Sequence, residues 1–202
     1  MFKHKRFHAA ARAVMILAAV SFTALYASAA EKKTGRSARG GLEAGDPAPG
    51  DPAYEATKSL HTTGQPQDVD VGAWRLVVAG GKAGTPLSLA YQDLEKMELT
   101  KKNVVLDCPG FFTDKADWEG VPLKSLLSMA QVGDDWSTLE FRSVDGFKSS
   151  LSRNEVEGNF TILALKVNGV TLPKEHGFPL RLVAENVTGG KWVKWIDRIE
   201  VK

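Results

Sequence analysis

The sequence predicts an α+β fold with mixed, largely antiparallel sheets and short helices. Segments rich in Val, Ile, Leu and aromatic residues, which favour strands, outnumber the segments with helical spacing. Two turn dipeptides, Asp145-Gly146 and Asn168-Gly169, follow such segments and favour hairpins between antiparallel strands. Long helical crossovers, which parallel strands require, are scarce. These observations argue against a regular parallel sheet.

The predicted elements lie between residues 74 and 201. We expect strands at residues 74–80, 102–108, 137–146, 179–185 and 192–201, and a hairpin at residues 162–173. A helix at residues 86–97 would be capped by Ser88 and would bury Leu89, Leu94 and Met97. A second helix at residues 121–130 has Pro122 in its first turn, where a backbone N–H is not needed.

Residues 1–30 have the three parts of an export signal. These are the basic stretch "KHKR", the apolar stretch "AVMILAAVSFTALYA" and the small residues Ala27-Ser28-Ala29. The alternative is an uncleaved membrane anchor, because the apolar stretch approaches the length of a membrane span. Lys5-Arg6 resembles a twin-arginine signal weakly, so the export route stays open. We expect a periplasmic or otherwise exported protein that touches a membrane only if this segment is retained.

Two further segments follow. Residues 31–70 are rich in Gly, Pro and Ala, as in "GDPAPGDPA", and show no apolar period, which predicts a flexible tether. Residues 71–202 form the predicted folded domain and are long enough to bury a core. The formal net charge is +2, and no Lys/Arg-rich patch with interleaved aromatic residues stands out. This composition argues against nucleic acid as a partner.

Several familiar catalytic motifs are absent from the sequence. It contains no G-x-S-x-G, no phosphate-binding P-loop, no C-x-x-C and no C-x-x-C-H. After residue 30 only His61 and His176 remain, so a His-rich zinc site is not expected.

Cys108, in the stretch "VVLDCPGFF", is the only cysteine of the chain. An exported protein sits where disulfides form, yet a single cysteine cannot form an internal disulfide. Such a thiol is reactive, bound to a metal, or paired with another molecule. One hypothesis is a thiol enzyme in which Cys108 and His176 act together. Another is a thiolate that binds a metal delivered inside an organic cofactor.

The C-terminal region offers donors for an anionic cofactor. Adjacent glycines allow backbone N–H groups to approach an anion closely, and an arginine offers two parallel donors. The alternative is that these charges lie on solvated strand faces beside a tight turn. Nearby Phe111, Phe112 and Trp118 would either form the cofactor pocket or belong to the core. The candidate donors occur in "HGFPLR" and "TGGKWVKW" and are His176, Arg181, Gly189, Gly190, Lys191 and Lys194.

Three stretches around Cys108 occur in a recognisable order. They are "VVLDCPG" (residues 104–110), "WEGVPLKSLL" (residues 118–127) and "HGFPLRLVAENVTGGKWVKWIDRIEV" (residues 176–201), with "VDGFKSSLSRNEV" as a weaker fourth. Together they resemble the molybdopterin-binding domain of the sulfite oxidase family, which also includes assimilatory nitrate reductases. The resemblance extends over residues 71–202.

The resemblance implies that the cofactor is molybdenum-molybdopterin and that Cys108 is the metal ligand at the catalytic centre. The implied reaction is two-electron oxygen-atom transfer on a small-molecule substrate, with electrons exchanged with a separate electron-transfer protein. The residues implied to contact the pterin or its phosphate are His176, Arg181 and Lys194, joined by Lys191 and the backbone of Gly189 and Gly190.

The sequence also departs from the family. Sulfite oxidases follow this cysteine with Gly-Asn-Arg, whose arginine helps to bind the anionic substrate, whereas "PGFFTDKADW" follows Cys108 here. Asp114 and Asp117 are acidic, so a neutral or zwitterionic oxide such as a sulfoxide fits better than sulfite. The family's second, immunoglobulin-like dimerisation domain has no counterpart in this sequence, so a minimal member is expected and its oligomeric state stays open. The alternative function is a non-catalytic binding module that retains the fold without molybdenum.

Overall fold

The computed structural model describes residues 48–81 and 85–202. The predicted signal or anchor at residues 1–30, and the predicted tether up to residue 47, lie outside the described residues. Among the residues that are described, no helix combines the length and the apolar character that crossing a membrane requires.

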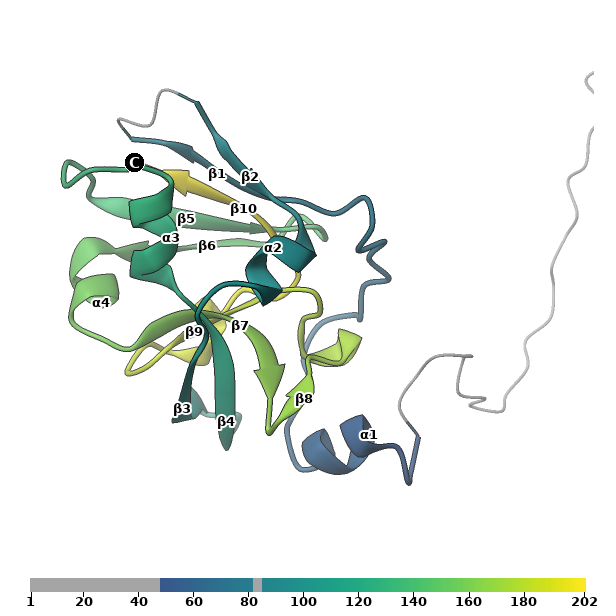
Figure 1. The fold of residues 1–202 in the computed structure, drawn as a ribbon. Coiled ribbons are helices and arrows are strands. Elements are labelled where there is room, and N and C mark those ends of the chain that lie inside the picture. The colour runs from purple at the N-terminus through teal and green to yellow at the C-terminus, as the bar shows by residue number, and fades with distance from the viewer. Residues whose placement is uncertain (1–47, 82–84) are drawn as a thin grey trace, which may run out of the picture. The chain divides into compact units, whose positions relative to one another are not determined.

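Two five-stranded sheets form the body of the domain (Figure 1). The first sheet contains β1 (Leu76–Gly80), β2 (Leu87–Leu89), β5 (Thr138–Ser143), β6 (Lys148–Ser152) and β10 (Ile196–Val201) in the order β2-β1-β10-β5-β6. The pairing of β1 with β10 is parallel, and the other pairings in this sheet are antiparallel.

The second sheet is wholly antiparallel. It contains β3 (Thr100–Cys108), β4 (Phe112–Pro122), β7 (Thr161–Val167) and β8 (Val170–Thr171) in that order, and β9 (Arg181–Ala184) also pairs with β7. The mixed, largely antiparallel α+β class predicted from the sequence is therefore confirmed.

The helices are short, and their ends follow from local chemistry. Asp51 caps α1, accepting a hydrogen bond from the N–H of Ala53, and Ser152 forms a capping box with Glu155 at α4. The α-helices are α1 (Pro52–Thr57), α2 (Tyr91–Glu95), α3 (Leu123–Met129) and α4 (Arg153–Glu157), and the 3₁₀ helices are η1 (Lys174–His176) and η2 (Gly189–Lys191).

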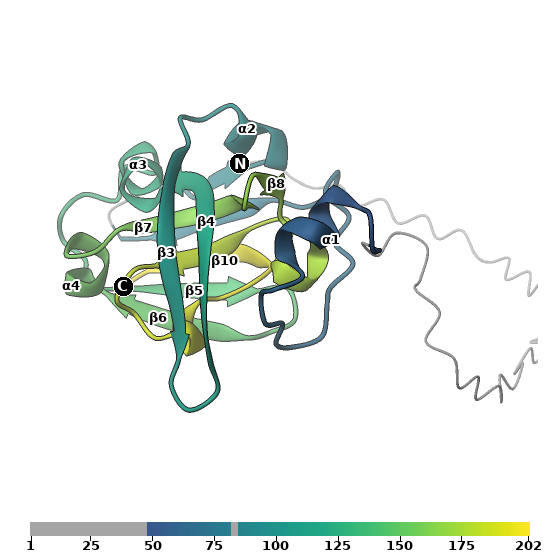
Figure 2. The same cartoon turned by 90° about the horizontal axis from the view of Figure 1, so that it is seen from below.

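Two local predictions were wrong. The segment expected as one helix at residues 86–97 is strand β2 followed by α2, because Leu89 pairs with Leu76 of β1 and places Ser88 inside the strand. Strand β4 was not predicted at all. It pairs with β3 from Phe112 to Gly120, so the residues after Cys108 form a long hairpin whose turn extends beyond the rest of the domain (Figure 2).

The core has two parts on opposite faces of the second sheet. Along β7, Leu163 and Leu165 belong to the larger core, which α2, α3 and α4 help to cover, while Ile162 and Ala164 belong to the smaller one. This alternation is the normal period of a strand. On β9 it places Arg181 on the same side as Val183, which belongs to the smaller core.

Residues 52–64, here called the N-terminal strap, contact the domain. Asn168 donates a hydrogen bond from Nδ2 to the carbonyl of Ala56 (2.7 Å), and Leu60 packs against the smaller core. The structure thus differs from the flexible tether predicted for residues 31–70: the part from residue 48 onward contains α1 and a segment held by hydrogen bonds. Composition alone conceals this, because the strap is fixed by polar contacts to distant residues.

Candidate functional site

A cavity of about 390 Å³ contains Cys108. The end of β3, the turn between β5 and β6, the region of η2 and the N-terminal strap all contribute to it. Five of the candidate residues line it, namely Cys108, Arg181, Gly189, Gly190 and Lys194. The other lining residues are His61, Thr63, Gly64, Phe112, Ser143, Asp145, Phe147, Trp192 and Trp195.

The strand period aims Cys108 into this cavity. Val104, Leu106 and Cys108 alternate along β3 and face the smaller core. A turn begins at once, with the N–H of Phe111 donating to the carbonyl of Cys108 (2.9 Å) and Gly110 in the left-handed region. Burial raises the pKa of the Cys108 thiol, and the neighbouring Arg181 guanidinium opposes this shift.

Gly189 lies directly against the thiol. A Cβ at this position would come within 2.5 Å of Cys108 Sγ and within 2.5 Å of Leu106 Cδ1. At Gly190 a Cβ would meet no atom within 4 Å. The two adjacent glycines therefore differ. The absence of a side chain at Gly189 allows η2 to approach the cysteine, whereas Gly190 has room for a side chain.

Arg181 is a deeply buried cation. The residue is 4% exposed, Nη1 donates to the carbonyl of His176 (3.1 Å), and Nε has no hydrogen-bond partner among the described residues. The guanidinium lies over the ring of Trp118 at 4.9 Å and near that of Trp192 at 6.0 Å. Within the described residues no carboxylate forms an ion pair with it. Burial lowers the pKa of Arg181 to about 10.

Lys194 is a second buried cation in the same cavity. Its Nζ donates to the carbonyls of Thr63 (2.8 Å) and Glu175 (2.7 Å), and no carboxylate of residues 48–81 and 85–202 forms an ion pair with it. Burial and the nearby Arg181 lower the pKa of Lys194 to about 7. Two desolvated cations in one cavity favour the binding of an anionic group.

Two of the candidate residues lie outside the cavity lining. His176 is buried in η1, where burial and the charges of Arg181 and Lys194 lower its pKa to about 4, so the imidazole is neutral at physiological pH. Lys191 forms an ion pair with Glu155 of α4 (2.5 Å). Among the described residues, no hydrogen bond joins His176 to Cys108. The arrangement therefore does not form the Cys108–His176 dyad considered from sequence.

Several lining residues were not found by sequence reasoning. His61, Thr63 and Gly64 belong to the segment expected to be a tether. Asp145 and Phe147 lie at the predicted turn after residue 144 and in the weaker fourth stretch of the resemblance, and these were the sequence signals for them. Of the three aromatic residues weighed as wall or core, Phe112 lines the cavity and Trp118 is in the core. Phe111 is 89% exposed at the turn of the β3–β4 hairpin.

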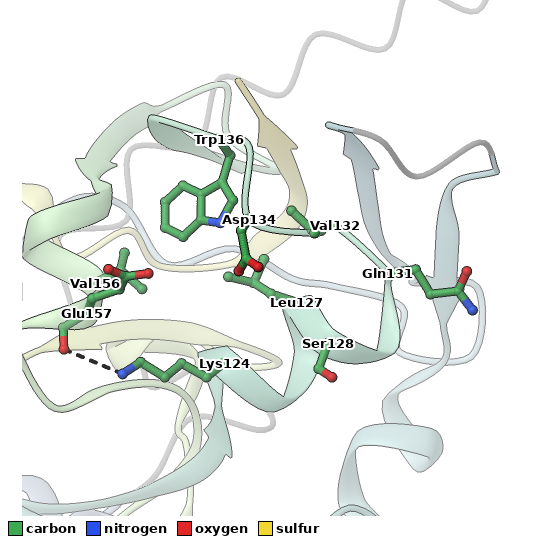
Figure 3. Close-up of a pocket in the computed structure, with 10 residues that line it drawn as sticks. Lys124, Leu127, Ser128, Gln131, Val132, Asp134, Trp136, Val156 and Glu157 are labelled. Carbon is green, nitrogen blue, oxygen red and sulfur yellow. Dashed lines mark hydrogen bonds between the residues drawn. The ribbon is translucent and has the colours of Figure 1, made fainter.

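A second, larger cavity of about 530 Å³ lies beside α3, α4 and the loop that precedes β5 (Figure 3). Lys124 and Glu157 lie at one side of it, joined by a hydrogen bond from Lys124 Nζ to the carbonyl of Glu157 (3.4 Å), and Trp136 lies at the other. Its lining contains no cysteine and no buried cation. It offers less to a charged or metal-containing ligand than the Cys108 cavity does.

Comparison with known proteins matches residues 62–202 to a family described as the oxidoreductase molybdopterin binding domain. The chain is 29% identical to mitochondrial sulfite oxidase of Mus musculus, over 67% of this chain and 30% of that protein. It is 28% identical to the uncharacterized oxidoreductase YuiH of Bacillus subtilis, over 70% of this chain and 71% of that protein. The chain thus spans about a third of the length of the sulfite oxidases that it matches.

A solved structure is also similar, the sulfane dehydrogenase SoxCD from Paracoccus pantotrophus. The TM-score is 0.60 at 26% sequence identity, and the match covers 67% of this chain and 40% of that chain.

The two adjacent glycines give a matched test of packing at Cys108. We expect Gly189→Ala to lower the free energy of unfolding by about 1–3 kcal/mol, because the new methyl group has no room beside Sγ and Leu106. Gly190→Ala should leave it nearly unchanged, because that position is open. Denaturant unfolding of both variants measures the difference, and equal stabilities would contradict the close approach.

The buried His176 gives a pH-dependent prediction. Its pKa is about 4 in the folded protein against the ordinary histidine value of 6.5, so the unfolded chain binds more protons between these values. Stability should therefore fall as pH decreases from 6.5 to 4, by up to roughly 3 kcal/mol for this residue. Unfolding curves of wild type and His176→Asn across this range measure the effect. Parallel pH profiles would show that His176 does not titrate abnormally.

Proposed function

Because the chain belongs to the oxidoreductase molybdopterin binding domain family, we propose that it is an exported enzyme that performs two-electron oxygen-atom transfer on a small substrate. Electrons would be exchanged with a separate electron-transfer protein. The buried pair of cations beside the only cysteine is the observation that supports this proposal most directly. Export is inferred from the sequence of residues 1–30 alone.

The residues of the cavity fit a molybdopterin cofactor. Arg181 Nε is buried and has no partner, so a donor is available for an acceptor atom of a ligand. Among the described residues no group of three or more His, Cys, Asp or Glu side chains could hold a metal ion. A metal bound through Cys108 must therefore bring its other ligands with it, as a cofactor that carries its own sulfur ligands does.

Each residue then has a defined task. Cys108 would bind the metal as a thiolate, so cofactor binding would displace the thiol proton whose release burial disfavours. Arg181 and Lys194 would hold the anionic part of the cofactor through charged hydrogen bonds. These bonds would replace the hydration that the two side chains lose on burial. Trp192 and Phe112 line the cavity with apolar surface that excludes water. The bound cofactor itself supplies the two-electron redox chemistry.

Metal analysis tests the proposal. Wild-type protein from cells that synthesise the cofactor should contain near-stoichiometric molybdenum, and Cys108→Ser should lose most of it because a hydroxyl is a poor ligand for a soft metal site. Elemental analysis and pterin fluorescence after denaturation measure both components. A folded wild-type chain without molybdenum or pterin would instead favour a non-catalytic binding module.

Two lysines near the cavity provide a matched comparison. Lys194 lines it, whereas Lys191 is paired with Glu155 outside it. We expect Lys194→Ala to weaken cofactor retention by about tenfold or more, the usual effect of losing a hydrogen bond from a charged group. Lys191→Ala should retain the cofactor. The molybdenum content after dilution and gel filtration measures retention, and an equal loss in both variants would contradict this assignment.

A further inference from the structure

His61 of the N-terminal strap is fixed by a buried carboxylate. Asp114 of β4 accepts the backbone N–H of His61 at Oδ2 (2.7 Å), and Oδ1 lies 2.7 Å from the imidazole Nδ1. The Asp114 side chain is only 5% exposed, whereas that of His61 is 59% exposed. Both oxygens of one buried acid are therefore used to hold a single, accessible residue.

The imidazole is held on a second side by an aromatic ring. It stacks on Phe112 with a centroid distance of 4.5 Å and an interplanar angle of 14°. Because the Asp114 oxygen accepts a hydrogen bond here, Nδ1 is the ring nitrogen that carries the hydrogen and donates it to this bond. Nε2 is then the ring nitrogen left for another molecule, and the stack and the hydrogen bonds limit how far the ring can turn.

The surroundings of His61 differ from the floor of the cavity. Arg181 and Lys194 are deeply buried there, whereas His61 and the half-exposed Phe147 lie at the accessible side. Asp145 also lines this side and accepts the N–H of Phe147 at Oδ1 (2.9 Å). Aromatic surface, one fixed imidazole and an acidic side chain suit an uncharged ligand better than an anion.

We propose that His61, positioned by Asp114 and Phe112, is a substrate-contacting residue of this cavity. Its Nε2 would accept a hydrogen bond from a hydroxyl or N–H group of a neutral small molecule whose apolar part lies against Phe112 and Phe147. The inference deepens the proposed function and rests on it, since the substrate would lie between His61 and the cofactor.

A purely structural role for His61 makes a different prediction. The two hydrogen bonds to Asp114 could serve only to attach the strap, in which case Nε2 is irrelevant. His61→Asn separates the roles, because an asparagine amide can still donate to Asp114 from a position close to that of Nδ1 but has no group at the position of Nε2. Thr62→Ala is the matched control, since Thr62 is an exposed neighbour in the strap that does not line the cavity.

The experiment measures binding and turnover of 4-(methylsulfinyl)phenol, a sulfoxide whose hydroxyl group can donate to Nε2, with sulfite as an anionic probe, on the full chain purified with its cofactor. Calorimetry gives the dissociation constants, and reduction of the sulfoxide with a viologen donor gives KM and kcat. We expect His61→Asn to weaken sulfoxide binding and raise KM about three- to tenfold, the effect of one lost hydrogen bond. Molybdenum content and melting temperature should stay near wild type, and Thr62→Ala should match wild type throughout.

The outcomes separate the two proposals. Unchanged sulfoxide binding in His61→Asn, or sulfite bound more tightly than the sulfoxide by wild type, would overturn the role of His61. Failure of the wild-type chain to bind the sulfoxide would overturn it as well. A wild-type chain that lacks molybdenum but binds the sulfoxide through His61 would support this inference and overturn the proposed function instead.

Discussion

The guanidinium of Arg181 is buried against two tryptophan rings, and within the described part of the chain no carboxylate forms an ion pair with it. Burial of an unpaired charge is costly, and here a second cation, Lys194, lies in the same cavity, where it donates to two backbone carbonyls and lies over the ring of Trp195. The other features of the cavity follow from this constraint. A negatively charged ligand would offset the free-energy cost of burying these cations, which the protein alone leaves uncompensated. Ligand binding should therefore increase the stability of the folded protein.

Close packing places the thiol beside these charges. Gly189 allows η2 to contact Cys108, and β9 presents Arg181 on the same side as the smaller core. His176 also supports Arg181, because its backbone carbonyl accepts a hydrogen bond from the guanidinium. Its buried imidazole remains neutral. It therefore acts by holding the arginine in place. A residue that a motif marks for ligand contact can thus belong to the support of the site.

The sequence predicted the fold class well, because short β-rich segments and turn dipeptides are local signals. It missed β4 because Asp114, a polar residue, occupies an inward position of that strand, between Phe112 and Ala116. The Cys108 and Arg181 positions could be predicted from motifs around a single thiol. His61 could not, because its position depends on hydrogen bonds to a residue 53 positions away. The different surroundings of Lys191 and Lys194 likewise arise only from tertiary contacts.

The strap changes where the functional unit begins. Composition placed the start of the domain at residue 71, yet His61, Thr63 and Gly64 form part of the cavity wall. Two polar attachments hold this wall, one from Asp114 of the second sheet and one from Lys194, which itself faces the cavity. Lys194 donates a hydrogen bond to the strap and also lines the cavity, where it could bind an anion. The same side chain therefore affects both the position of the strap and the binding of a ligand. Removing the strap would therefore open the cavity and also leave the Lys194 ammonium with one fewer acceptor, so the folded core and the complete site have different boundaries.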